Sequence, residues 1–260
     1  MKRLLAYALM LFSPLSFSAP KSDLWPYWDV SNQQSSTSLS HHKWQAILDI
    51  YLISQGEYTL FKYAQVTPSD KEKLTQYLSD LSNTDPRELN KKEQYAYWVN
   101  FYNALTVQLI LDNYPVASIT KIGSWFGFGP WDDEIANVAG KPLTLNDIEH
   151  RILRPIWGDP RTHYAINCAS LGCPNLQPKA FTAENTELLL EKAARDFINS
   201  HKGVSYRDGH LTLSSIYDWF AQDFGSRTQL FDHLSKYRTG VTHYEGKIKY
   251  EYDWKLNEKK

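Results

Sequence analysis

The sequence predicts an α+β fold in a single domain. Helical periodicity dominates residues 43–114, and short alternating stretches typical of antiparallel strands follow mainly after residue 135, with helices between them. Of the 260 residues, 42% are hydrophobic and 14% are aromatic. Because large aromatic side chains bury much apolar area, the chain is able to build one sizeable core. We therefore expect one α+β domain over residues 43–260.

Three helices are expected before residue 115. They span about 43–54, 69–82 and 90–114, and the last is apolar on nearly every side. A helix of that kind lies in the centre of a domain. Asn100 and Asn103 inside it are costly to bury unless their amides are hydrogen-bonded.

The second half of the chain alternates short strands with helices. Ala139-Gly140 and Asp208-Gly209 are typical hairpin turns, and Thr144, Thr182 and Ser214 are suitable helix N-caps. The expected hairpins span 135–144 and 204–213, the expected single strands 163–167 and 247–254, and the expected helices 144–153, 182–201 and 214–224.

The N-terminus has the layout of a secretory signal peptide. Lys2 and Arg3 precede an apolar run over residues 4–12, and mostly small residues follow. We expect residues 1–18 to be removed and residues 19–42 to form a loose polar arm. The apolar run is short for a membrane span, so we expect no stable membrane insertion after cleavage and a periplasmic or secreted protein.

Charge and motifs exclude several classes of function. The 28 basic and 29 acidic residues give a net charge of −1, which argues against a nucleic-acid partner recognised through bulk charge. A phosphate-binding loop, a dinucleotide-binding glycine motif and a zinc-protease helix motif are all missing from the sequence. Two cysteines are too few for a typical structural zinc site. We expect no metal and no cofactor.

The segment from His163 to Pro174 is the richest in chemistry, because it contains both cysteines of the chain. Cys168 follows the expected strand and precedes small residues that permit a tight turn, where backbone N–H groups are able to stabilise a thiolate. A cysteine paired with a histidine is the usual arrangement for acyl transfer. His163 and His150 are the two nearest candidate bases.

Several polar residues are candidates to orient such an imidazole. Glu149, Asn167 and Asn103 are all available, and the sequence does not choose among them. Glu149 has a second interpretation, in which it pairs with a buried arginine and serves the fold alone. Asn103 is also a candidate for contact with substrate.

Two other fates of the cysteines stay open. In an oxidising compartment Cys168 and Cys173 are first suspected of forming a disulfide. Five residues apart in a regular helix their Cα atoms would lie about 8 Å apart, so a bridge needs a loop that folds back around Gly172. Thiol redox exchange is the third interpretation.

A glycine- and aromatic-rich loop spans residues 123–131. Aromatic residues flank its glycines in the sequence, which argues against a phosphate-binding loop. The loop forms either a packed structural element or a wall or lid of a cleft, and in the second case Trp125 and Trp131 are the substrate-binding candidates.

Four ordered blocks of the chain resemble the domain-of-unknown-function 547 family. Together they cover roughly residues 90 to 257. The blocks are Tyr97–Thr106, Leu145–Arg154, Asp159–Cys168 and Tyr252–Asn257.

That family is distantly similar to papain-like and transglutaminase-like cysteine enzymes, in particular the phytochelatin-synthase and glutathione-hydrolase branch. The resemblance implies a papain-like core with a central buried helix that begins at the nucleophilic cysteine. This chain departs from the pattern, because Asn100 and Asn103 occupy that region and Cys168 comes after His163.

The resemblance implies an exported cysteine-dependent hydrolase or acyltransferase that acts on a small peptide or a thiol peptide such as glutathione. The alternative is a non-catalytic ligand-binding or protein-interaction module with a Cys168–Cys173 disulfide.

Overall fold

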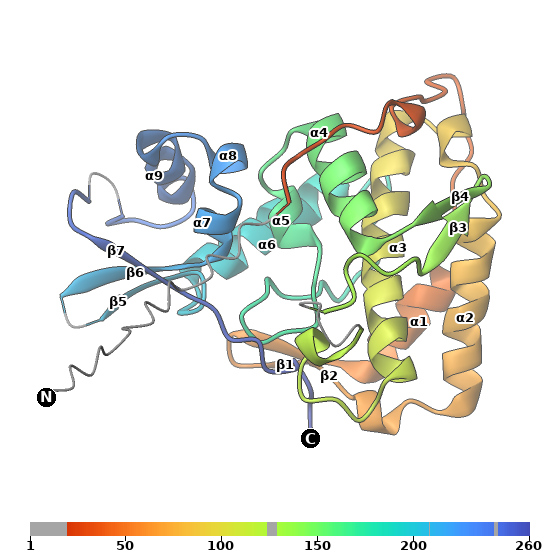
Figure 1. Cartoon of the computed structure of the whole chain (residues 1–260), viewed down its shortest axis with the longest axis horizontal. Helices are drawn as coiled ribbons and strands as arrows, with labels where there is room; N and C mark the ends of the chain where they lie inside the picture. The colour runs from red at the N-terminus through yellow and green to blue at the C-terminus, as the bar shows by residue number, and fades with distance from the viewer. Residues whose placement is uncertain (1–19, 124–128, 208, 242–243) are drawn as a thin grey trace, which may run out of the picture.

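The computed structural model describes residues 20–123, 129–207, 209–241 and 244–260 (Figure 1). Helices and small sheets are mixed along these residues, which confirms the α+β class. No helix in the described ranges is long and apolar enough to cross a bilayer. The expected signal peptide, residues 1–18, lies outside the described residues.

Three long helices pack side by side on the right of Figure 1. They are α1 (His42–Tyr51), α2 (Pro68–Ser82) and α3 (Lys91–Asp112). Asn90 caps α3 by accepting backbone N–H groups of its first turn. Every residue of the stretch 93–107 is buried, so the expected central helix is confirmed.

A hairpin follows α1 where the sequence predicted the end of a helix. The chain leaves α1 after Tyr51 and forms β1 (Leu52–Gln55) and β2 (Tyr58–Phe61), which pair antiparallel. The C-terminal residues lie beside this hairpin, and the backbone of Phe61 bonds to both Asn257 and Lys259. Pairing with segments far away in sequence therefore takes residues 52–55 out of the helix.

The central segment matches its sequence-based expectation except for length. The expected hairpin is present as β3 (Ala136–Val138) and β4 (Lys141–Leu143). The next helix is π-helical over η5 (Asp147–Leu153) and continues as α4 (Arg154–Trp157), four residues beyond its expected end. Thr144 caps it through the Asp147 N–H.

A three-stranded sheet forms the other side of the molecule, at the left of Figure 1. Its order is β5–β6–β7, with β5 (Val204–Arg207) antiparallel and β7 (Ile248–Glu251) parallel to β6 (His210–Ser214). Helix α6 (Thr186–Asn199) leads into β5. Three short helices lie between β6 and β7 in the chain and share the buried cluster of the sheet: α7 (Ile216–Trp219), α8 (Ala221–Phe224) and α9 (Arg227–Ser235).

The strand expected at residues 163–167 is wrong. Residues Thr162–Ala165 form a single helical turn, α5, which begins after the Asp159-Pro160 turn. The apparent alternation misled because all residues from 162 to 167 are buried, so the period of two does not mark one buried face. The chain becomes extended only at Ile166, directly before Cys168.

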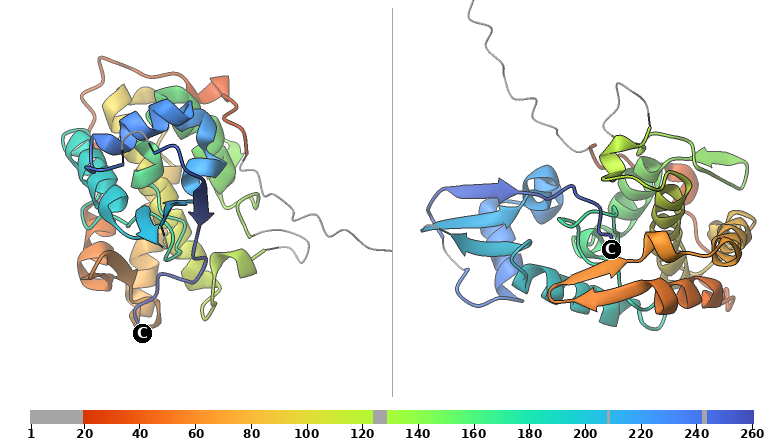
Figure 2. Two further views of the ribbon diagram at one scale, coloured as in Figure 1. Left: turned by 90° about the vertical axis from the view of Figure 1, so that its left-hand side faces the viewer. Right: turned by 90° about the horizontal axis from the view of Figure 1, so that it is seen from below.

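The N-terminal arm lies along the domain (Figure 2). Trp28 is fully buried and packs edge-on against Trp98 of α3, with ring centroids 5.2 Å apart. The backbone amides of Asp23 and Trp25 donate to carbonyls of η5. The remaining short 3-10 turns are η1 (Pro26–Trp28), η2 (Tyr63–Gln65), η3 (Pro86–Glu88) and η4 (Ile119–Lys121).

Candidate thiol site

Cys168 lies in a strained loop directly after α5. The next residue, Ala169, has a φ of 57°, a left-handed conformation that a residue with a side chain adopts only at a cost. The side chain of Asn167 holds the turn, because its Oδ1 accepts the Ala169 N–H at 2.9 Å. This local bond stabilises the conformation that presents the Cys168 side chain.

The side chain of Asn103, on helix α3, holds the cysteine loop through two hydrogen bonds to its backbone. Its Nδ2 donates to the Ala165 carbonyl at 2.9 Å, and its Oδ1 accepts the Asn167 N–H at 2.8 Å. The side-chain amide of Asn167 in turn donates to the Pro174 carbonyl at 2.7 Å. Both amide side chains are buried and fully used in holding backbone. They therefore position the cysteine loop.

The loop folds back around Gly172 and brings the two sulfurs together. The Gly172 N–H donates to the Asp253 carbonyl at 2.8 Å. A Cβ at position 172 would lie 2.6 Å from the Asp253 nitrogen, so only glycine allows this approach. The sulfurs of Cys168 and Cys173 lie 3.0 Å apart, and both cysteines are free thiols in the structure.

The environment of Cys168 favours its thiolate. Burial by itself raises the pKa of this thiol, but hydrogen bonds to its sulfur outweigh burial and lower the pKa below the usual value for cysteine. The donors are the Cys173 thiol, the Ser170 hydroxyl and backbone amide, and the Tyr252 hydroxyl, which lies 2.9 Å from Sγ. Cys168 is half-buried, so a reagent is able to reach it.

Cys173 has the opposite character. It is buried, and burial together with the neighbouring Cys168 sulfur raises the pKa of its thiol well above the usual value. An acidic, accessible thiol thus lies beside a weakly acidic, buried one. The pair titrates as a unit, with one proton held much more tightly than the other.

Lys202 approaches the thiol pair from the end of α6. Its ammonium donates to the Cys173 carbonyl at 2.6 Å and to Asn175 Oδ1 at 2.7 Å. Burial lowers the pKa of Lys202 to about 8. An ammonium that is still mostly protonated at neutral pH therefore contacts the backbone of the second cysteine.

The histidines occupy a separate buried cluster. His163 Nε2 lies 2.7 Å from Asp223 Oδ2, and the imidazole stacks on Phe220 with centroids 4.1 Å apart. Burial lowers the pKa of His163, whereas hydrogen bonds from His163 and Arg154 outweigh burial and lower that of Asp223. His163 is therefore a neutral imidazole that donates to a carboxylate. Its described polar contacts do not include Cys168.

Arg154 binds this cluster together. It makes two hydrogen bonds to Asp223, of 2.6 and 3.1 Å, and donates to His150 Nδ1 at 2.9 Å and to the Pro20 carbonyl at 2.8 Å. His150 is consequently an acceptor, and burial lowers its pKa well below the usual value.

Glu149 lies between the histidine cluster and the thiols. It accepts a hydrogen bond from Tyr102 at 3.1 Å, and its Oε1 is 3.8 Å from His163 Nδ1. Burial raises the pKa of Glu149 to about 7, and the negative charge of the Cys168 thiolate acts in the same direction. The charge of Arg154 opposes this rise in the pKa of Glu149, but the Arg154 guanidinium is paired with Asp223.

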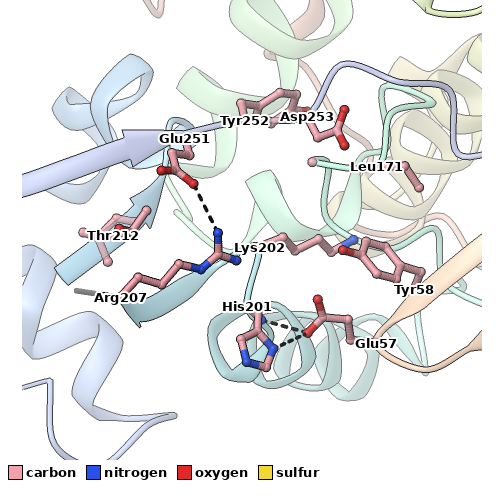
Figure 3. A pocket seen from close by; sticks show the side chains of 12 residues that line it. Glu57, Tyr58, Leu171, His201, Lys202, Arg207, Thr212, Glu251, Tyr252 and Asp253 are labelled. Atoms are coloured by element: carbon pink, nitrogen blue, oxygen red, sulfur yellow. Dashed lines mark hydrogen bonds and ion pairs between the residues drawn. The ribbon is translucent and has the colours of Figure 1, made fainter. Parts of the chain in front are cut away.

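A cavity of about 780 Å³ opens next to the cysteine loop, whose Leu171 and Gly172 line it, whereas the two cysteines are not among its lining residues (Figure 3). Its walls come from the β1–β2 hairpin, the loop at 171–172, the turn before β5, the end of β5, the middle of β6, and the end of β7 with the two residues after it. Tyr252, which contacts the Cys168 sulfur, lines one wall, and Lys202 lines another. The size is in the range of small-molecule sites.

The two tryptophans expected to bind substrate, Trp125 and Trp131, are not among the described residues that line this cavity. Trp125 lies outside the described residues. Trp131 is half-buried and packs against Trp254, with centroids 5.7 Å apart. Among the described ranges, no group of His, Cys, Asp and Glu side chains is arranged to hold a metal ion.

Residues 86–198 match the model of the family described as "Protein of unknown function, DUF547". We refer to residues 86–198, which are similar to that family, as the DUF547 segment. The DUF547 segment runs from η3 into α6 and includes both cysteines, Glu149 and His163. No curated protein and no solved structure gives a significant match to the chain.

Three residues that shape the site escaped the sequence-based prediction. Tyr252 and Lys202 lie outside the DUF547 segment and reach the thiols only through the fold, and Asp223 holds His163 from α8. Tyr252 begins the last of the four blocks that resemble the family, and that was the one available signal in the sequence.

Proposed function

We propose that this chain is an exported thiol enzyme in which Cys168 and Cys173 exchange disulfides with small thiol compounds. The observation that carries the proposal is the contact of the two sulfurs at 3.0 Å, with the acidic thiol accessible and the other buried. A low-pKa attacking thiol next to a buried resolving thiol suits disulfide exchange. The expected signal peptide supports export to a compartment where disulfides persist.

The exchange proceeds in two steps. The Cys168 thiolate attacks one sulfur of a substrate disulfide, and a mixed disulfide forms as one substrate thiolate leaves. Cys173 gives its proton to the departing thiolate and then attacks the Cys168 sulfur, which releases the second substrate thiolate. Two electrons have passed from the protein dithiol to the substrate disulfide, and two equivalents of a small thiol reverse the steps.

The cysteine loop offers little to the competing chemistry of acyl transfer. Acyl transfer needs free N–H donors for an oxyanion. The amides of residues 168, 169 and 170 are used by Cys173 Sγ, Asn167 Oδ1 and the Cys168 sulfur. Those of residues 171, 172 and 173 are used by the carbonyls of residues 255, 253 and 170. Disulfide exchange needs neither these donors nor an imidazole.

The two cysteines provide a direct test, because the chain has no others. The mature protein, Cys173→Ser and Cys168→Ser are each incubated with oxidised glutathione and followed by intact mass. We expect Cys173→Ser to accumulate one glutathione adduct, and the unmodified protein to end as an intramolecular disulfide. Cys168→Ser reacts at least tenfold more slowly. Equal rates for both variants, or a protein that stays reduced, would overturn the proposal.

A second candidate is hydrolysis or acyl transfer on a small peptide or thiol peptide, within the papain-like core that the family resemblance implies. The observation that favours it is the His163–Asp223 pair, since an imidazole oriented by a carboxylate is the usual partner of a nucleophile. Turnover of a peptide panel that is lost in both Cys168→Ala and His163→Ala would support it. Undiminished turnover in Cys168→Ala would discard it.

The third candidate, a binding module with a permanent Cys168–Cys173 disulfide, has its own outcome in these experiments. The purified protein would then show no alkylation without a reductant and no exchange with glutathione.

A further inference from the structure

Lys202 is a positive charge that the described protein leaves without a carboxylate. Its two hydrogen bonds go to neutral oxygens, the Cys173 carbonyl and the Asn175 side chain. The ammonium also lies 5.0 Å from the centroid of the Tyr58 ring and 6.0 Å from that of Phe197, so among the residues that the structure describes its other partners are neutral aromatic rings. A half-buried charge without a counter-ion is costly, so a ligand that supplies one gains affinity.

The acidic side chains of the same cavity already have partners. Glu57 accepts from the His201 backbone at 2.8 Å and from its ring at 3.2 Å. Asp253 accepts the Lys255 N–H at 3.0 Å, and Glu251 lies 3.7 Å from Arg207 in an exposed pair. Figure 3 shows Lys202 extended across the cavity toward Tyr58. None of these carboxylates reaches the Lys202 ammonium within ion-pair distance.

Building on the proposed function, we infer that the cavity is the substrate subsite and that Lys202 binds a free carboxylate of a small thiol or disulfide, assisted by Arg207. The cavity lies between the ammonium of Lys202 and the hydroxyl of Tyr252, because both residues line it. Lys202 contacts the backbone of Cys173 on one side, and Tyr252 contacts the sulfur of Cys168 on another. A compact substrate whose carboxylate lies at Lys202 therefore carries its sulfur toward the thiol pair.

The test measures binding without exchange. S-methylglutathione has free carboxylates but a blocked sulfur, and its dimethyl ester lacks the carboxylates. Both are titrated into the reduced protein by calorimetry. We expect the acid to bind roughly 10- to 100-fold more tightly than the ester. This ratio of dissociation constants corresponds to the free energy of one charge-assisted hydrogen bond. Equal dissociation constants, or no binding of either probe, would overturn the inference.

Variants locate the site. The side chain of Arg207 is exposed. Arg207→Gln should weaken binding of S-methylglutathione severalfold and leave binding of its ester unchanged. Lys202→Met should remove the difference between the two probes, and Lys249→Met, an exposed lysine on β7, is the matched control. An acid preference that survives Lys202→Met, or that falls equally in Lys249→Met, places the carboxylate elsewhere.

Failure of the inference and failure of the proposed function are distinguishable. Glutathione exchange at Cys168 without binding of S-methylglutathione removes the subsite and keeps the dithiol. Binding of the acid without any exchange keeps an anion subsite and removes the thiol chemistry.

Discussion

The hydroxyl of Tyr252 lies 2.9 Å from the sulfur of Cys168, although the two residues are 84 positions apart in the chain. Tyr252 follows β7, and the strand brings it over the cysteine loop of the DUF547 segment. Burial raises the pKa of Tyr252 well above its usual value, so the phenol keeps its proton and donates a hydrogen bond to the thiolate. The C-terminal strand thereby completes a site that the central segment begins.

Tyr252→Phe should make Cys168 less acidic. The variant removes one donor to the thiolate, and we expect the pKa of Cys168 to rise by about one unit, the value of a modest charge-assisted hydrogen bond. The rate of iodoacetamide alkylation against pH measures it, and the midpoint should move upward. Tyr250→Phe, at an exposed position of β7, is the control. An unchanged midpoint in Tyr252→Phe would show that the contact does not tune the thiol.

Asp223→Asn should weaken the fold and leave the thiol chemistry unchanged. Arg154 is buried and pairs with Asp223, so loss of the carboxylate leaves an uncompensated charge worth about 3 kcal/mol of unfolding free energy. Urea unfolding measures this loss, with the exposed Asp218→Asn as control. The alkylation midpoint of Cys168 should stay in place. A shifted midpoint would instead favour the acyl-transfer candidate.

Glu149→Gln should stabilise the protein at high pH relative to low pH. The pKa of Glu149 is raised from 4.5 to about 7 in the folded state, mainly by burial. The folded chain therefore keeps a proton that the unfolded chain releases, and the native protein loses stability as pH rises from about 4.5 to about 7. Glutamine does not titrate and still accepts from Tyr102.

The gain of Glu149→Gln over the native protein should thus be larger at pH 8 than at pH 4.5, by about 3 kcal/mol at about 1.4 kcal/mol per pKa unit. Urea unfolding at the two pH values measures it. The exposed Glu72→Gln serves as control and should show no such difference. A gain that is equal at both pH values would contradict the raised pKa of Glu149.

Asn103→Ala should loosen the cysteine loop. The variant leaves the Ala165 carbonyl and the Asn167 N–H buried without their partner, at a cost of about 1–3 kcal/mol for each group. We expect a lower unfolding free energy and faster hydrogen exchange at Asn167. Asn113→Ala, at the exposed end of α3, controls for loss of an amide. Unchanged exchange at Asn167 would separate α3 from the loop.

Trp28→Ala should release the N-terminal arm. Trp28 is fully buried against Trp98, and removal of a buried indole costs about 3–5 kcal/mol. Limited proteolysis near residues 20–40 should accelerate together with the fall in stability. Trp25→Ala, at a half-buried position, should cost less. A small loss at Trp28 would mean that the arm does not belong to the core.

Local pattern was enough for the elements that depend on their own residues. The central helix followed from apolar residues on all its sides together with the Asn90 cap, and α3 has both. The hairpin at Ala139-Gly140 followed from its turn residues, and β3 and β4 pair there. Where distant segments compete, local pattern failed. Residues 52–55 leave α1 to pair with β2, and the alternation at residues 162–165 did not indicate a strand because these residues of α5 are all buried.

The sequence by itself determined the class of the fold and the buried helix at its centre, and it singled out the two cysteines as a candidate site. Only the tertiary structure decided which groups surround Cys168, because Tyr252 arrives from β7 and Lys202 from the end of α6. It also separated His163 from the sulfur by committing the imidazole to Asp223. Periodicity and capping act over a few residues, whereas the acidity of a thiol depends on donors that only packing brings within hydrogen-bonding distance.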